Sequence, residues 1–293
     1  MIPNQPQIRP DLPIAPQRST LEAMLASVED GSMDEIIQSK IEQWKLPYFV
    51  ENGILKDTLS QGEVYLRQFI TCDPLTIQMK EDARLISKTN YSVLIYGATG
   101  TGKEIIAKSM IGDRKGEPVK AVNVAALPSE LVESELFGSV KGSYTGSTGD
   151  KEGLFTSAKA GIMFLDEVGE LALHLQAKLL RVLQDNTIRK VGSNKDEQIN
   201  CKFVCATHRD LKNMVNKGLF REDLYARIST LELDIRPLEQ RLCDCVPIAE
   251  SIPKGKKFLE RYSNELKNGK LDLSLNVRSI QRYIIRFDTL GKI

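Results

Sequence analysis

A glycine-rich turn after a short apolar strand constrains this chain more than any other feature. Residues 93–96 read Val-Leu-Ile-Tyr, residues 97–104 read Gly-Ala-Thr-Gly-Thr-Gly-Lys-Glu, and an amphipathic segment follows at 105–110. Strand, glycine turn and helix in that order are the context of a phosphate-binding P-loop. Glycines let backbone N–H groups surround phosphate oxygens, and a lysine adds positive charge at the outer phosphates. The predicted nucleotide-binding residues are Gly97, Ala98, Thr99, Gly100, Thr101, Gly102, Lys103 and Glu104.

One position departs from the general P-loop pattern. The pattern expects a serine or threonine after the lysine, because its hydroxyl contacts Mg²⁺, and Glu104 stands there instead. Taken alone, this stretch therefore leaves open a glycine-rich turn that carries a surface lysine. A second motif has to decide between the two interpretations.

That second motif is a pair of acids at the end of another apolar strand. Residues 161–167 read Gly-Ile-Met-Phe-Leu-Asp-Glu, so Asp166 and Glu167 follow the strand directly. Ligands of open α/β sheets bind at the carboxyl ends of the strands. In P-loop NTPases the first acid holds Mg²⁺, and the second orients and deprotonates the attacking water. Capping of the next helix is the alternative role for these acids, and the presence of Lys103 upstream makes it the weaker one.

The bulk composition fits an ordinary globular protein. The 293 residues carry a net charge of +1, with 41% hydrophobic and 27% charged residues. This length allows an α/β core and one small domain. The absence of a basic cluster argues against a nucleic-acid partner, and the absence of a long apolar run or leader predicts a cytoplasmic protein with no membrane partner. The spacing of the five cysteines matches no zinc module, so we expect reduced, mostly buried thiols.

Short β-rich runs alternate with helix-length segments through the middle of the chain. The runs lie at 93–96, 119–124, 162–165, 202–206 and 231–235. Such alternation predicts an α/β fold with a mostly parallel five-stranded sheet sandwiched by helices. After Pro237 only helical patterns remain, and they predict a small C-terminal helical lid with helices at 241–249, 256–266 and 277–287.

The first part of the chain has weaker patterns. Residues 1–18 contain five prolines and almost no apolar periodicity, which predicts an extended tail. Apolar residues recur at helical spacing over 19–44, with a break at Gly31, and no assignment follows for 46–69. The predicted organisation is an N-terminal extension at 1–72, an α/β core at 73–237 and a helical lid at 238–293.

Several further segments, in order along the chain, resemble a known family. Besides the glycine loop, they are Val-Asn-Val-Ala-Ala-Leu at 122–127, Glu-Ser-Glu-Leu-Phe-Gly at 133–138, Gln-Ala-Lys-Leu-Leu-Arg-Val-Leu-Gln at 176–184 and Phe-Arg-Glu-Asp-Leu-Tyr at 220–225. Together they resemble the AAA+ domain of sigma-54-dependent transcriptional activators, the bacterial enhancer-binding proteins. The resemblance is continuous from about residue 73 to 249 and weaker beyond. It implies an ATPase that uses ATP and Mg²⁺, and in this family a glutamate follows the P-loop lysine, as Glu104 does.

The resemblance also assigns roles around the γ-phosphate. Asn123 matches the family residue that hydrogen-bonds the catalytic glutamate, here Glu167, and withholds it until the right nucleotide state. Thr207 matches the first sensor position. The family usually has asparagine next, where this chain has His208, which is either a modifier of γ-phosphate sensing or an ordinary cap or surface imidazole.

Three arginines match family positions that reach a nucleotide. Arg221 and Arg227 match the two candidate arginine fingers, which would stabilise charge at the γ-phosphate of the adjacent subunit; ion pairs with Glu222 or Asp223 are the alternative. A finger that acts in trans implies self-assembly into a ring, taken here as a hexamer. In Asn-Val-Arg-Ser-Ile at 276–280, Arg278 matches the second sensor, although the family has glutamate in place of the serine that follows.

The loop at 142–147 matches the family segment that reads GAFTGA and pushes on sigma-54 as ATP turns over. Its residues are Gly142, Ser143, Tyr144, Thr145, Gly146 and Ser147. Glycines provide a hinge, and the aromatic ring and hydroxyl offer a contact surface.

The resemblance therefore implies that the sigma-54 RNA polymerase holoenzyme is a partner. The alternative is a loop that has drifted, in a nucleotide-binding regulatory ring protein without remodelling activity. A remodelling ATPase with another protein substrate is a weaker third possibility. We expect neither the sensory domain nor the DNA-binding helix-turn-helix domain that family members commonly carry.

Overall fold

A computed structural model describes residues 60–112, 117–143 and 149–293, which belong to one compact unit, Ser60–Ile293. The predicted helices and loops before residue 60 therefore lie outside the described residues. Within the described part, no helix is both long and apolar enough to cross a bilayer.

A five-stranded parallel sheet forms the centre of the core. Its spatial order is β2-β5-β8-β1-β9, and every neighbouring pair is parallel. The strands are β1 (Val93–Gly97), β2 (Val119–Asn123), β5 (Ile162–Asp166), β8 (Lys202–Thr207) and β9 (Leu231–Ile235). The predicted mostly parallel five-stranded sheet is confirmed, and the predicted runs match these strands to within a residue.

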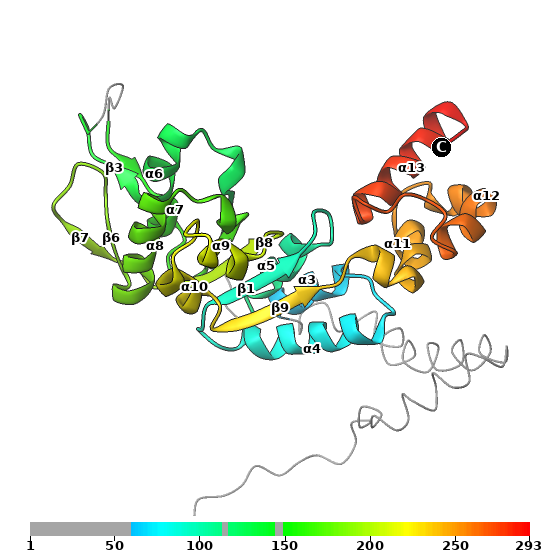
Figure 1. Ribbon diagram of the computed structural model, residues 1–293, viewed down its shortest axis with the longest axis horizontal. Helices are drawn as coiled ribbons and strands as arrows, with labels where there is room; N and C mark the ends of the chain where they lie inside the picture. The colour runs from blue at the N-terminus through cyan, green and yellow to red at the C-terminus, as the bar shows by residue number, and fades with distance from the viewer. Residues whose placement is uncertain (1–59, 113–116, 144–148) are drawn as a thin grey trace, which may run out of the picture. The chain divides into compact units, whose positions relative to one another are not determined.

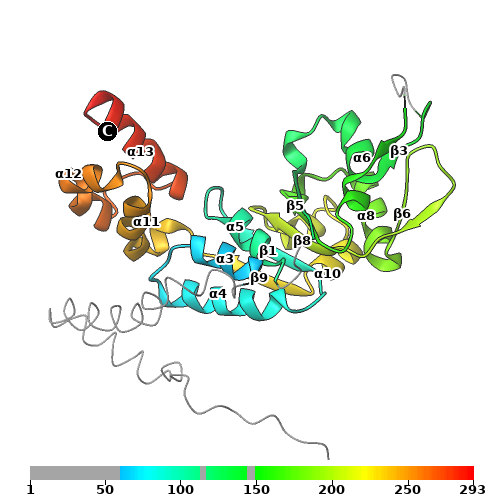
Figure 2. The ribbon, with the colours of Figure 1, turned by 180° about the vertical axis from the view of Figure 1, so that it is seen from behind.

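Helices cover both faces of the sheet (Figure 1 and Figure 2). Side chains alternate along each strand, so that Val93 and Ile95 join one hydrophobic cluster and Leu94 joins the other. The first cluster includes helices α3 (Gln61–Gln68), α4 (Pro74–Ser87) and α5 (Lys103–Ser109). The second includes α6 (Ser129–Phe137), α7 (Leu154–Ser157), α8 (Leu173–Asp185), α9 (Leu211–Asn216) and α10 (Glu222–Ile228). Burial on both faces explains why the inner strands β1, β5 and β8 are mostly apolar, whereas the edge strands β2 and β9 also carry polar and charged residues.

A separate hydrophobic cluster holds the C-terminal helices together. They are α11 (Cys245–Ser251), α12 (Gly255–Lys267) and α13 (Val277–Leu290), which form the orange-to-red group in Figure 1. Phe258 stacks on Tyr262 with ring centroids 5.2 Å apart, and Phe287 meets both rings edge-on. The predicted helical lid is therefore present, with a 3-10 turn at Leu242–Asp244 in place of the first turn of the helix expected from residue 241.

Some elements were not predicted from the sequence. Helix α3 lies in the unassigned stretch and packs on α5 so closely that a Cβ on Gly62 would lie 2.4 Å from the Ser109 carbonyl oxygen. Leu66 and Phe69 join the core cluster, so the core extends upstream of residue 73. Two antiparallel ribbons add to the core: β3 (Gly138–Ser139) with β4 (Lys151–Glu152), and β6 (Thr187–Arg189) with β7 (Asp196–Gln198).

Phe155 provides a test of the core. Its side chain is fully buried between Phe137 and Phe203, with ring centroids at 5.2 and 5.7 Å. We expect Phe155→Ala to lower the free energy of unfolding by about 3–5 kcal/mol, because it removes a buried ring and leaves a cavity. Denaturant unfolding measures the change, with Leu85→Ala at a 64% exposed position as the control. Equal unfolding midpoints for the two variants would contradict the packing described here.

Candidate active site

The glycine loop joins β1 to α5 in a backbone conformation that side chains would not allow. Gly100 and Gly102 have φ of +81° and +105°. A Cβ on Gly102 would lie 2.7 Å from the ring of Phe69, and one on Gly100 would lie 2.3 Å from the carbonyl oxygen of Leu275. Both glycines are therefore required by close approach as well as by φ.

Lys103 begins α5 and is only 7% exposed. Its Nζ donates to the Gly97 carbonyl oxygen at 2.9 Å and lies 3.5 Å from Oε1 of Glu167. The ammonium group thus lies between the loop and the second strand-end acid. Glu104 points away from it, because its carboxylate pairs with Lys108 at 2.7 Å on the exposed side of the helix. Glu104 therefore does not replace the missing hydroxyl in this conformation.

Asp166 is the last residue of β5 and Glu167 follows it, next to the end of β2. Asp166 accepts from the Glu167 backbone N–H at 3.1 Å and from Nδ2 of Asn123 at 3.3 Å. Burial and the neighbouring Glu167 carboxylate raise the pKa of Asp166. Two crowded carboxylates offer the hard oxygen ligands that Mg²⁺ prefers, so the donor set fits the predicted metal. Glu167 adopts left-handed φ and ψ of 56° and 48°, an uncommon conformation for a residue other than glycine.

Glu167 has a different partner from the one expected. Nδ1 of His208 lies 2.7 Å from Oε2 of Glu167, and the His208 backbone N–H donates to the same oxygen at 3.3 Å. Asn123 contacts Asp166 instead, because the parallel register of β2 and β5 sets these two residues side by side. The departure from the family pattern at His208 was the sequence signal for this contact, but the partner was not predicted.

Thr207 ends β8 and is fully buried. Its Oγ1 accepts from the Arg209 backbone N–H at 3.0 Å, and its register partner in β1 is Tyr96, the residue before the glycine loop. Thr207 therefore lies at the same edge of the sheet as the loop and the two acids. The sheet brings Lys103, Asp166, Glu167 and Thr207 together at the carboxyl ends of three neighbouring strands.

The two predicted arginine fingers lie on the α10 segment. Arg221 pairs with Asp223 at 2.7 Å, which is the alternative contact considered from the sequence. The guanidinium of Arg227 donates to the Leu183 carbonyl oxygen at 3.2 Å through two nitrogens. Within the described residues, the two arginines therefore bond to α10 and α8 and not to the glycine loop.

The lid contacts the glycine loop through the segment before α13. Asn276 is 1% exposed, donates from Nδ2 to the Thr99 carbonyl oxygen at 3.0 Å and accepts from the Leu238 backbone N–H at 2.6 Å. The Val277 N–H donates to the Gly100 carbonyl oxygen at 3.2 Å. Arg278 follows directly, with its Cγ 3.4 Å from the point where a Cβ on Gly100 would lie. The sequence indicated Arg278 but missed the role of Asn276.

A buried ion pair in the lid contacts the glycine loop through Arg241. Arg241 and Asp244 pair at 2.7 Å with side chains 1% and 0% exposed. Arg241 also donates to the Thr101 carbonyl oxygen at 3.2 Å and lies over the ring of Phe69 at 5.3 Å from its centroid. Neither residue was predicted, because no motif distinguishes a buried ion pair from exposed charges.

The predicted partner loop begins at the end of the β3–β4 ribbon. Gly142 has φ of +78°, and Ser143 donates from its backbone N–H to the Val140 carbonyl oxygen at 3.2 Å. Asp150 on the return side accepts from the Lys141 backbone N–H at 2.8 Å. The rest of the predicted loop lies outside the described residues, namely Tyr144, Thr145, Gly146 and Ser147.

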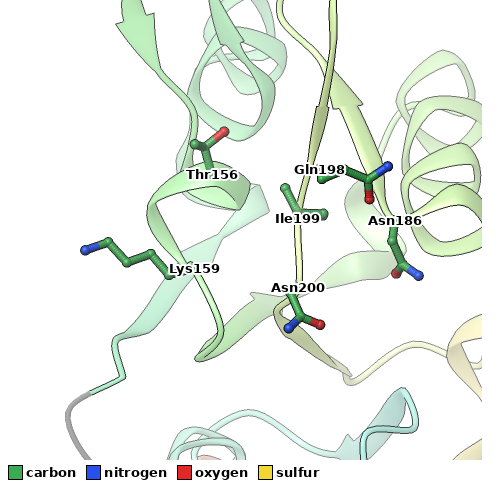
Figure 3. A pocket seen from close by; sticks show the side chains of 6 residues that line it. All are labelled: Thr156, Lys159, Asn186, Gln198, Ile199 and Asn200. Atoms are coloured by element: carbon green, nitrogen blue, oxygen red, sulfur yellow. The ribbon is translucent and has the colours of Figure 1, made fainter.

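A pocket of about 430 Å³ lies elsewhere on the core (Figure 3). Lys159 and Asn200 lie shortly before β5 and β8, so the pocket is at the amino ends of the strands. It contains none of the predicted site residues and is lined by Thr156, Lys159, Asn186, Gln198, Ile199 and Asn200.

Comparison with known proteins gives consistent matches. A family model described as the sigma-54 interaction domain matches residues 69–234. The transcriptional regulatory protein GlrR of Escherichia coli is 35% identical over 88% of this chain and 60% of its own length. The regulatory protein LuxO of Vibrio parahaemolyticus is 36% identical over 94% of this chain and 64% of its own length. The chain thus spans about three fifths of the length of these curated relatives.

Solved structures support the same fold. A crystal structure of NtrX from Brucella abortus has a TM-score of 0.67 at 24% identity, covering 93% of this chain and 63% of that one. A structure of NtrX in complex with ATP has the same TM-score at 23% identity, covering 93% and 65%. The fold is therefore that of an AAA+ core with a C-terminal helical lid.

Gly100→Ala tests the contact between the loop and the lid. Gly218→Ala is a matched control, since Gly218 also has a positive φ, of +69°, but an added Cβ there would have no atom within 4 Å. Each variant incurs about 1–2 kcal/mol of backbone strain. Only Gly100→Ala also forces a methyl group against the Leu275 carbonyl, so we expect it to be the less stable variant and to speed amide exchange at residues 275–279. Thermal unfolding and hydrogen exchange measure the two effects. Equal exchange rates in the two variants would show that the contact does not hold the lid.

Proposed function

The chain belongs to the family of proteins with a sigma-54 interaction domain, and from this membership we propose that it is an ATP-hydrolysing AAA+ transcription regulator of the sigma-54 activator type. The observation that carries the proposal is the meeting of Lys103, Asp166, Glu167 and Thr207 at one edge of the sheet. A lysine, a metal-binding acid, a general base and a polar sensor are the groups that hydrolysis of a γ-phosphate requires. The same edge holds the glycine loop.

The residues divide the work of hydrolysis between them. The glycine loop and Lys103 would bind the phosphates, and Asp166 would hold Mg²⁺, which would supply positive charge at the phosphate oxygens. Glu167 orients and deprotonates the attacking water. Thr207 and Arg278 report on the nucleotide from β8 and from the lid. For Glu167 to reach water, its carboxylate has to leave Lys103 and His208, both of which it contacts here.

The site is completed by a second subunit in this proposal. Arg221 and Arg227 are exposed, and they contact Asp223 in α10 and the Leu183 carbonyl oxygen in α8. A guanidinium that is free to exchange an intrachain partner for a phosphate can act as a finger on a neighbouring subunit. Self-assembly into a ring, a hexamer in this proposal, supplies one finger to each site.

The loop at 142–147 is the proposed contact with sigma-54 RNA polymerase holoenzyme in the cytoplasm. Its position at the end of the short β3–β4 ribbon, which the hydrogen bond from Lys141 to Asp150 extends, supports this role, because the ribbon joins the loop directly to the core. Gly142 at positive φ supplies the turn that begins the loop. Tyr144 and Thr145 would present a ring and a hydroxyl to the partner.

Mixing two inactive variants tests whether the sites are shared between subunits. Lys103→Ala removes nucleotide binding but keeps the finger, and Arg227→Ala keeps the nucleotide site but loses the finger. We expect each variant alone to lose about 10³-fold or more in turnover. Lys103→Ala cannot bind the nucleotide, and Arg227→Ala lacks the finger that stabilises charge in the transition state. An equimolar mixture should regain ATP hydrolysis, measured by phosphate release against protein concentration.

Two controls show which arginine acts as the finger and whether Glu167 acts as the general base. A mixture of Lys103→Ala with Arg221→Ala shows whether Arg221 is the finger instead, and Glu167→Gln should bind ATP without hydrolysing it. If no mixture regains activity although every variant folds and the wild type is active, the finger does not act in trans. If the wild type never hydrolyses ATP at any concentration, the proposed function is wrong.

Tyr144→Ala tests the loop separately from the ATPase. We expect this variant to keep ATP hydrolysis and to lose binding to sigma-54, because the ring is the largest apolar group of the loop tip. Binding is measured by native gel shift with purified sigma-54 and a γ-phosphate transition-state analogue. Tyr91→Ala, at a 62% exposed position outside the loop, should bind as the wild type does. A wild type that hydrolyses ATP but never binds sigma-54 would overturn the partner and leave the ATPase standing.

A further inference from the structure

Two thiols that are far apart in the sequence meet at the base of the lid. Cys72 lies just before α4, and Cys243 lies in the 3-10 turn just before α11. Their sulfur atoms and a carboxylate oxygen of Asp244 all lie within 4.8 Å of one another. Cys72 is partly exposed and Cys243 is exposed, whereas the other free thiols, Cys201, Cys205 and Cys245, are buried. Small oxidants in solution can therefore reach this pair.

The segments that carry the two thiols are held together independently of sulfur. Asp244 accepts from Oγ1 of Thr71 at 2.7 Å, from the Cys72 backbone N–H at 2.6 Å and from the Asp73 backbone N–H at 3.2 Å. Asp244 immediately follows Cys243, so these bonds fix one thiol beside the other. Reaction between the two sulfurs is therefore favoured by their proximity.

Cys243 differs from the other four cysteines in the direction of its pKa shift. A hydrogen bond with Cys72 lowers the pKa of Cys243, and the same contact raises the pKa of Cys72. Burial raises the pKa of Cys205 to about 12 and that of Cys245 to about 12. Because the thiolate is the reactive form, Cys243 is the thiol best placed to react first.

We propose that Cys72 and Cys243 are a redox modification site, at which a peroxide forms a reversible disulfide between the start of α4 and the base of the lid. The Cys243 thiolate attacks one peroxide oxygen, the O–O bond breaks, and the products are a sulfenic acid and, after protonation, water. The Cys72 thiol then attacks the Cys243 sulfur, forming the S–S bond and breaking the S–O bond, and a second water leaves with the thiol proton. Two electrons pass from the sulfurs to the peroxide, and a dithiol reductant reverses the change.

A metal site fits these residues less well than a disulfide does. The carboxylate of Asp244 already accepts from Thr71, Cys72, Asp73 and the guanidinium of Arg241. Zinc sites in proteins use three or four ligands, and two thiolates beside an arginine-paired carboxylate do not supply them. The pair is therefore assigned to thiol chemistry.

A disulfide here would act on the part of the lid that supports the glycine loop. Arg241, two residues before Cys243, donates to the carbonyl oxygen of Thr101. The cross-link would close a long loop of chain and restrict the unfolded state, so it should raise the thermal midpoint. It would also limit any rotation of the lid base relative to α4.

Peptide mapping of the full chain tests the proposal. Reduced protein is treated with hydrogen peroxide, alkylated and cleaved on the amino side of aspartate, which separates Cys72 from Asp73, and Cys243 from Asp244 and Cys245. We expect a cross-linked pair of peptides that joins Cys72 to Cys243 and disappears on treatment with dithiothreitol. Cys72→Ser and Cys243→Ser should each abolish it, and Cys245→Ala should retain it. The thermal midpoint should rise on oxidation in the wild type and stay unchanged in Cys72→Ser.

Other results would overturn the proposal. They are the absence of the cross-link, a Cys243–Cys243 link between two chains, conversion of Cys243 to sulfinic acid while Cys72 stays free, or one equivalent of zinc bound by the reduced protein and lost in both serine variants. None of these measurements uses ATP hydrolysis or sigma-54. Failure here is therefore distinct from failure of the proposed function.

Discussion

The close approach that two glycines permit is the constraint on which the rest of this structure depends. Without a Cβ at Gly100 and Gly102, the loop backbone can lie against the Leu275 carbonyl on one side and the Phe69 ring on the other. The carbonyl groups of residues 99–101 then accept hydrogen bonds from Asn276, Val277 and Arg241. The glycine loop therefore connects the α/β core, the segment before α4 and the lid, in addition to its proposed role in nucleotide binding.

The sheet could be predicted from the sequence because its inner strands β1, β5 and β8 are buried on both faces, which leaves short apolar runs between helix-length segments. The two ribbons could not, since strands of two or three residues have no composition of their own and exist only through pairing. Helix α3 was missed for a related reason. Its eight residues are stabilised by packing on α5, where Gly62 allows close contact, and not by a periodic pattern that continues along the chain.

Some residues of the candidate site could likewise be predicted from the sequence, and others could not. Asp166, Glu167 and Thr207 could be located because strand ends are fixed by the sheet, and parallel strands deliver their ends to one edge. The hydrogen-bond partner of Glu167 could not be predicted from the sequence. The strand register sets Asn123 beside Asp166, and the Glu167 carboxylate contacts His208 instead. Buried polar residues such as Asn276 were missed because burial, which gives them their role, is a property of the folded chain.

The contacts of the lid with the core differ in strength, and the difference indicates where the lid can move. Burial acts to raise the pKa of Asp244, but hydrogen bonds from the Cys72 backbone N–H, Arg241 and Thr71 outweigh it and keep that pKa low. On the core side, Thr71 and the backbone N–H groups of Cys72 and Asp73 donate to the Asp244 carboxylate, and a hydrogen bond to a charged group contributes about 1.5–3 kcal/mol. The neutral hydrogen bonds at Asn276 contribute about 0.5–1.5 kcal/mol each. Movement of the lid therefore costs least at the Asn276 contacts with the glycine loop, while the base of the lid at Arg241 and Asp244 stays fixed to the core.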